Sequence, residues 1–115
     1  MSKTPTETQR EALYDILSGI EGVKKVYYQQ PYTSGLKYPC IIYGLNRLET
    51  KYASDRRYLT FPSYTVTLID YDPDTILQKK ILDLDGPCSV SFDRFFTDDN
   101  LNHWVYTLVF TESLW

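Results

Sequence analysis

The chain has 115 residues, of which 43% are hydrophobic and 23% charged, and its formal net charge is −3. This length fits a single domain spanning residues 1–115, and the composition excludes a disordered chain. A mildly acidic chain without a basic run is not expected to bind nucleic acid by bulk attraction, and no apolar stretch approaches the roughly 20 residues of a membrane span. The first residues, MSKTPTETQREAL, lack the apolar core of a signal peptide, so we expect no export from the cytosol.

Residues 4–19 are predicted to form a helix. Glu7 follows Thr4 at capping-box spacing, and Pro5 suits a first helical turn. Apolar residues then recur at the i, i+3, i+4, i+7 spacing of a helix with one buried face: Leu13, Ile16, Leu17 and Ile20.

Three predicted strands follow this helix. Residues 23–30 form a short one, after which comes a loop rich in turn-forming residues. The segments 40–52 and 58–71 predict two long strands, and the polar turn 53–57 joins them as an extended antiparallel hairpin. Pro62 cannot donate a hydrogen bond to a β-ladder, so it marks an edge, a bulge or a bend.

The second half of the chain predicts a helix over residues 73–84 and strands over 88–96 and 103–112. The last strand is apolar on both faces, which is typical of a strand covered on both sides or facing a partner. Its first face carries Trp104, Tyr106, Leu108 and Phe110, and its second Val105, Thr107 and Val109. The order α-β-β-β-α-β-β predicts an α+β fold, with two helices on one face of a mainly antiparallel sheet of about five strands.

The segment LIDYDPDT places aspartates at three alternate positions, a spacing found in calcium-binding loops. An EF-hand loop starting at Asp70 would need Gly and Glu where this chain has Thr75 and Ile81. We therefore interpret the acids structurally. Asp70 ends a strand, Asp72 caps the following helix, and Asp74 interacts with the positive end of the helix dipole.

Other candidates for chemistry are few. His103 is the only histidine and has no nucleophile motif beside it, while Asp98 and Asp99 are ordinary turn residues. The two cysteines, Cys40 and Cys88, form no CxxC motif and are expected to be reduced, packed thiols. The glycines form no phosphate-binding motif. We assign no catalytic residue, no metal ligand and no cofactor. A small metal-dependent hydrolase that uses these aspartates and His103 stays open as an alternative.

Three segments read together resemble a family of small siphophage tail-completion proteins, the tail terminators or head–tail joining proteins. They are KYPCIIYGL (37–45), YTVTLIDYDPD (64–74) and CSVSFDRFFTDDNLNHWVYTLVF (88–110). The most specific parts are the YPCI-Y strand start, the IDxDPD junction and the run FDRxFTxDNLNH. None of these motifs is a catalytic signature.

The resemblance implies a structural role in the virion, at the junction of tail and neck. Terminators are similar α+β domains that form a ring, usually a homohexamer, on the last ring of tail tube proteins. The ring stops tube growth and joins the tail to the neck or stopper protein, and DNA passes only through its lumen. It implies no catalysis, no cofactor and no membrane. Another neck connector, such as a stopper or adaptor, is the nearest alternative, and a peptide-binding module with a free strand edge is a more distant one.

The hairpin around residues 46–60 is the predicted docking arm, because its tip combines charged residues with an aromatic anchor. The chain has 11 tyrosines, which suit strands and protein interfaces equally well. Apolar residues at a terminus also need cover, either from the protein's own sheet or from a neighbouring subunit. The predicted interface residues are Lys51, Tyr52, Arg56, Arg57, Tyr58, Leu114 and Trp115.

Replacing Arg56 and Arg57 together by alanine is expected to weaken ring assembly or docking on the tube, because both cations are removed from the predicted tip. The measurement is the fraction of tails joined to heads in lysates of phage that carry the double variant. Unchanged joining would contradict the arm hypothesis.

Overall fold

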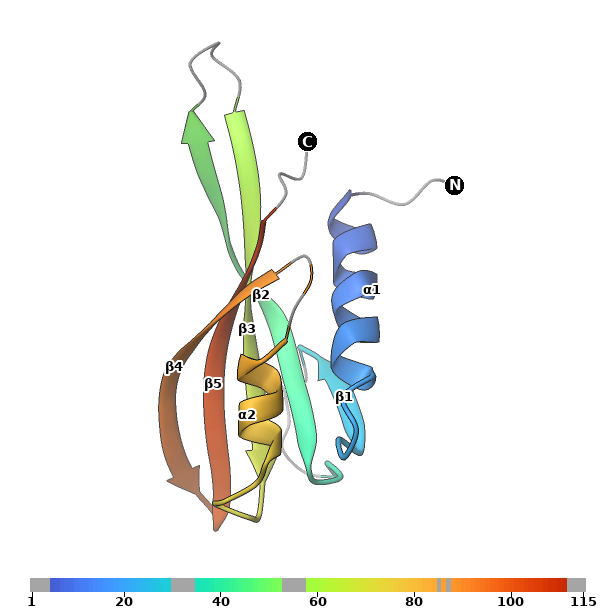
Figure 1. Cartoon of the computed structure of the whole chain (residues 1–115), viewed down its shortest axis with the longest axis vertical. Helices are drawn as coiled ribbons and strands as arrows, with labels where there is room; N and C mark the ends of the chain where they lie inside the picture. Colours follow the sequence, from blue (N-terminus) through green and yellow to red (C-terminus); the bar gives the residue numbers. More distant parts are fainter. Residues whose placement is uncertain (1–4, 30–34, 53–57, 85, 87, 112–115) are drawn as a thin grey trace.

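The computed structural model describes residues 5–29, 35–52, 58–84, 86 and 88–111. The fold is α+β, and its elements follow the predicted order (Figure 1). They are α1 (Pro5–Ser18), β1 (Lys25–Tyr28), β2 (Cys40–Tyr52), β3 (Tyr58–Asp70), α2 (Leu77–Leu82), β4 (Cys88–Asp98) and β5 (Leu101–Phe110).

The five strands form one sheet in the order β1-β2-β3-β5-β4. The pairs β2–β3, β3–β5 and β5–β4 are antiparallel, as predicted for most of the sheet, whereas β1 runs parallel to β2. The last strand, β5, inserts between β3 and β4, so β4 becomes an edge strand. Both helices lie on the same face of the sheet (Figure 1).

The core lies between the two helices and this face. Leu13 and Leu17 of α1 and Leu77 and Ile81 of α2 are buried there against alternate residues of the strands. The apolar stripes predicted for the first helix and the last strand are therefore confirmed. From β5 the stripe supplies Trp104, Tyr106, Leu108 and Phe110, all buried.

An aromatic row crosses four strands on this face. The ring centroids of Tyr28 and Tyr43 are 5.1 Å apart, those of Tyr43 and Tyr64 6.5 Å, and those of Tyr64 and Phe110 5.7 Å. The Arg10 guanidinium of α1 lies 4.9 Å from the Tyr28 centroid, within cation–π range. Several of the tyrosines thus serve the core and the docking of α1.

The opposite face of the sheet carries no helix in the part of the chain that the structure describes. Its side chains are mostly threonine and β-branched aliphatic residues, which suit a half-exposed pleated surface. Among them are Ile42, Thr65, Thr67, Thr107 and Val109, all partly buried. The helices therefore cover one of the two apolar faces of β5, and the other face belongs to this helix-free surface of the sheet.

The second helix is shorter than the predicted segment 73–84, and the capping role given to Asp72 is wrong. The residue before the helix is Ile76, which makes no side-chain capping bond. Asp72 instead accepts the backbone N–H of Asp74 at 2.9 Å, and Asp70 accepts that of Asp72 at 3.2 Å. These side-chain bonds hold the segment in turns, which delays the helix.

The connection between β4 and β5 is tighter than predicted. Asp98 pairs with Leu101, so only Asp99 and Asn100 form the loop. Both have positive φ, 51° and 63°, the left-handed conformation that two-residue type I′ hairpins require and that Asp and Asn tolerate. As a result β4 extends two residues past its predicted end, to Asp98, and β5 begins two residues before its predicted start, at Leu101.

Both cysteines are free thiols, as predicted. Burial raises the pKa of Cys40 to about 12, with a smaller contribution from the Asp70 carboxylate, and burial raises that of Cys88 to about 11. Since the thiolate is the reactive form, both sulfurs are poor nucleophiles near neutral pH.

Two fully buried tyrosines differ in how their hydroxyl groups are satisfied. The Tyr106 hydroxyl donates to the Gln78 carbonyl oxygen at 2.9 Å, whereas the Tyr64 hydroxyl has no partner within the described structure. We expect Tyr106→Phe to lower the free energy of unfolding by about 1 kcal/mol and Tyr64→Phe to leave it unchanged or raise it. Urea denaturation of the two matched variants measures this. An equal loss in both would contradict the assignment.

Candidate functional site

The most prominent feature of the molecule is a two-stranded projection. Strand β5 stops pairing with β3 at Ser63, and β1 stops pairing with β2 at Tyr43, yet β2 and β3 pair as far as Tyr52 and Tyr58. Residues 46–52 and 58–62 therefore extend beyond the sheet as a ribbon, here called the arm (Figure 1).

The sequence explains where the arm begins. Pro62 directly precedes Ser63, the first β3 residue paired with β5, and it cannot supply an N–H to extend that ladder. An isolated two-stranded ribbon is marginally stable in water. The arm is thus a segment that further pairing or packing would stabilise.

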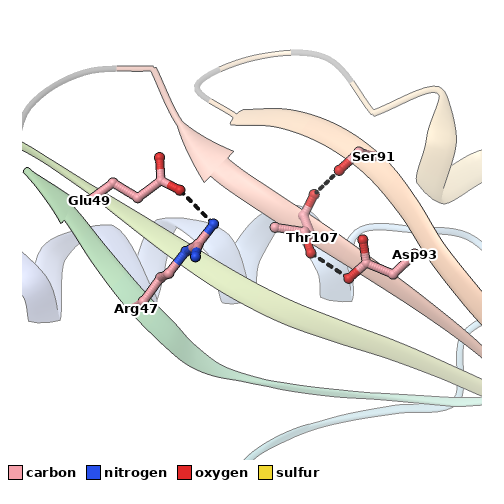
Figure 2. Close-up of polar contacts among 5 residues, drawn as sticks. All are labelled: Arg47, Glu49, Ser91, Asp93 and Thr107. Atoms are coloured by element: carbon pink, nitrogen blue, oxygen red, sulfur yellow. Dashed lines mark hydrogen bonds and ion pairs between the residues drawn. The ribbon is translucent and has the colours of Figure 1, made fainter.

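The described base of the arm combines apolar and charged side chains. A bulge between Leu45 and Arg47 adds one residue to β2, and Leu45 and Leu48 are 36% and 46% exposed. Arg47 forms an ion pair with Glu49 at 2.9 Å (Figure 2). Solvent-accessible pairs of this kind add little stability, so either side chain can exchange this partner for another at a small cost in free energy.

The predicted interface residues are placed only in part. The backbones of Lys51, Tyr52 and Tyr58 lie in the outermost described pairs of the arm, with Lys51 opposite Leu59 and Tyr52 opposite Tyr58. The remaining four lie outside the described residues: Arg56, Arg57, Leu114 and Trp115.

A second surface was missed by the sequence reasoning. Three phenylalanines on the edge strand β4 are largely exposed: Phe92 at 46%, Phe95 at 48% and Phe96 at 39%. Phe92 packs one side on Tyr106 and Phe95 on Trp104, with centroids 5.5 and 5.3 Å apart. We call residues 89–98 of this strand the β4 edge.

Polar contacts fix the conformation of the β4 edge. A bulge lies between Phe92 and Arg94, and the hydroxyl of Thr107 donates to the Asp93 carboxylate at 2.6 Å (Figure 2). The Ser91 hydroxyl donates to the Thr107 carbonyl oxygen at 3.5 Å. The Arg94 guanidinium lies 5.6 Å from the Phe96 centroid. In a regular strand, alternation along FDRFF would indicate which phenylalanines face the core. The bulge breaks this alternation, so the sequence gives no such indication.

Three residues of the hydrolase alternative meet at one small cavity. Asp98, Asp99 and His103 line it together with Tyr38, Ile69 and Leu101, and its volume is about 100 Å³. Burial raises the pKa of Tyr38, aided by nearby Cys40 and Tyr71, so this phenol stays protonated. The cavity is sized for a few water molecules rather than for a substrate of ordinary size.

The imidazole of His103 is held by two contacts. Its ring stacks on Phe96 with centroids 4.5 Å apart, and its Nδ1 lies 3.1 Å from the Leu101 carbonyl oxygen. A carbonyl only accepts, so Nδ1 carries the proton and Nε2 is the basic nitrogen. Among the described residues that line the cavity there is no serine, threonine or cysteine for that base to activate.

Two of the three alternate aspartates bond to the local backbone. Asp70 and Asp72 accept backbone N–H groups of their own turn, and Asp74 is exposed. Within the described ranges, no group of three histidine, cysteine, aspartate or glutamate residues is arranged to hold a metal ion.

Of the helices in the described residues, none is long and apolar enough to cross a membrane. Comparison of the chain with protein-family models gives no match, and comparison with curated proteins gives no match.

Asp72→Ala is expected to lower the free energy of unfolding by about 1 kcal/mol, because the Asp74 N–H loses its acceptor. Asp72→Asn keeps an acceptor oxygen without the charge and serves as the matched control, with stability close to that of the parent. Thermal unfolding measures both, with and without calcium or manganese. A rise in the melting temperature with either cation would reverse the structural interpretation of these acids.

Proposed function

We propose that this protein is a structural virion protein that caps the phage tail tube as a homo-oligomeric ring, stops tube growth and joins the tail to the neck. The observation that carries the proposal is the arm, which lies on an α+β domain of the kind that the sequence resemblance implies. A terminator needs surfaces for its own copies, for the last ring of the tube and for the neck.

The two edges of the sheet support a ring. A head-to-tail contact joins two unlike surfaces, and repeating it gives a closed ring when the rotation closes. The β4 edge, with its exposed phenylalanines, lies at one side of the sheet, while the arm continues β2 and β3, the second and third strands counted from the other side. A subunit with two different adhesive sides fits this type of assembly.

The charge of the chain is compatible with DNA passing through a lumen. The net charge is −3, and DNA that slides through the ring should not be held by a strongly basic surface. The arm has mixed charges in Arg47 and Glu49, which suits a specific protein contact better than a nucleic-acid contact.

The test is a phage in which translation of this gene is stopped by a nonsense codon. We expect overlong or unattached tails beside DNA-filled heads in negatively stained lysates, because nothing caps the growing tube. The control is the same phage complemented by an intact copy of the gene.

Two outcomes would reject the proposed role. Tails of normal length beside leaking heads would assign the protein to the head side of the neck. Normal, infectious particles would remove it from tail completion altogether and return the cavity beside His103 to consideration.

A further inference from the structure

We infer that two copies of this chain join by strand addition, with the β4 edge of one copy pairing antiparallel with the free edge of β2 at the base of the arm in the next. This inference names the contact between subunits. The ring rests on the proposed function, whereas the pairing itself does not.

Both edges have backbone groups available for a further strand. On its outer side β4 has no neighbour among the described strands, and β2 beyond Tyr43 pairs with β3 alone. Long edge strands with exposed apolar side chains are the sites where sheets add strands from other chains. Here Phe92 and Phe95 project from one edge, and Leu45 and Leu48 project from the other.

The two edges have matching patterns. Leu45-Asn46-Arg47-Leu48 and Phe92-Asp93-Arg94-Phe95 each place an arginine before the second apolar residue, and each contains a bulge after the first. When the segments run antiparallel, one register brings the two bulges opposite each other. Its pairs are Leu45 with Phe95, Asn46 with Arg94, Arg47 with Asp93, Leu48 with Phe92, and Glu49 with Ser91.

This register keeps each side chain on the correct face. Leu45 pairs with Tyr64, and Phe92 and Phe95 pair with Tyr106 and Trp104, so all three project on the helix-bearing face. Leu48 lies on the same face, because the bulge between Leu45 and Arg47 restores the alternation. The four apolar side chains would therefore form one cluster between the copies and lose much of their exposed surface.

On the opposite face the register brings unlike charges together. Arg47, whose side chain is 68% exposed, would face Asp93. The Asp93 carboxylate receives Thr107 through Oδ2, and its other oxygen has lone pairs for a guanidinium. The intramolecular partner of Arg47 is Glu49, whose side chain is 34% exposed, and a solvent-accessible pair adds little stability, so little is lost if Arg47 turns toward a neighbour.

The direction of the strands makes the contact head-to-tail. Three successive antiparallel pairings separate β2 from β4, so these two strands run in opposite directions within one copy. A second copy that continues the sheet with the same face outward therefore presents its β2 antiparallel to the β4 of the first. No two-fold axis is involved, and the contact can repeat from copy to copy.

Disulfide trapping tests this register. Glu49→Cys and Ser91→Cys are prepared as separate proteins, mixed at high concentration and oxidised mildly. Directly opposite residues in a sheet lie within the Cα separation of a disulfide. We expect the mixed disulfide to form at least about tenfold faster than that between Glu49→Cys and the off-register control Ser89→Cys. The native thiols compete little, since their pKa values lie at about 11 and 12.

A charge exchange provides a second readout that spares the apolar cluster. Arg47→Asp and Asp93→Arg are each expected to weaken self-association about tenfold in sedimentation experiments, because each places like charges opposite. The double variant restores opposite charges and should recover most of the association. Urea denaturation of each variant verifies that the fold is retained.

Several outcomes would overturn the inference. One is equal trapping in and off register, and another is failure of the double variant to recover association. A third is preferential trapping between Ser91→Cys and Phe96→Cys, which are opposite each other when β4 edges pair with themselves around Asp93 and Arg94.

The purified protein suffices for these tests. Trapping in register together with normal particles from the nonsense phage would reject the terminator role alone, and uncapped tails without trapping would reject this contact alone.

Discussion

The one-sided core is the interaction on which the rest of the structure depends. Alternate side chains of β3 and β5, including Tyr64, Leu68, Trp104 and Tyr106, are buried against α1 and α2, and both helices are used on that face. Sheets with helices segregated to one face bury their apolar surface in a single layer. The contacts left to the molecule are therefore the strand edges, the arm and the threonine-rich face.

The strand order then decides which edges are free. Because β5 inserts between β3 and β4, β4 lies at the outside of the sheet and has no second neighbouring strand among the described residues, and its phenylalanines are largely exposed. At the other side, β1 covers only four residues of β2 and leaves the rest of that strand paired on one side. Proteins commonly protect such strand edges against pairing with other chains by charged side chains and bulges. Both are present here, the charges being those of Asp93, Arg94 and Arg47. We interpret these charges and bulges as features that restrict strand addition to one partner rather than features that prevent it.

Much of the fold follows from periodicity in the sequence. The stripes of the first helix and the last strand indicated their buried faces, and the turn residues separated the long hairpin correctly. The start of α2 did not follow, because Asp70 and Asp72 bond to nearby backbone N–H groups and hold turns where a helical pattern begins. The exposed β4 edge did not follow either. The bulge before Arg94 shifts the alternation by one residue, and only the pairing with β5 reveals it.

The position of β5 also constrains the order in which the chain can become structured. The β2–β3 hairpin is local in sequence, so its pairing is available early, whereas Asp70 pairs with Asn102 and Ser63 with Val109 across much longer loops. Long loops cost more entropy to close, and the interior edge of β3 receives no partner until the last strand has been synthesised. A nascent chain thus carries an unpaired edge of β3 until β5 has been synthesised.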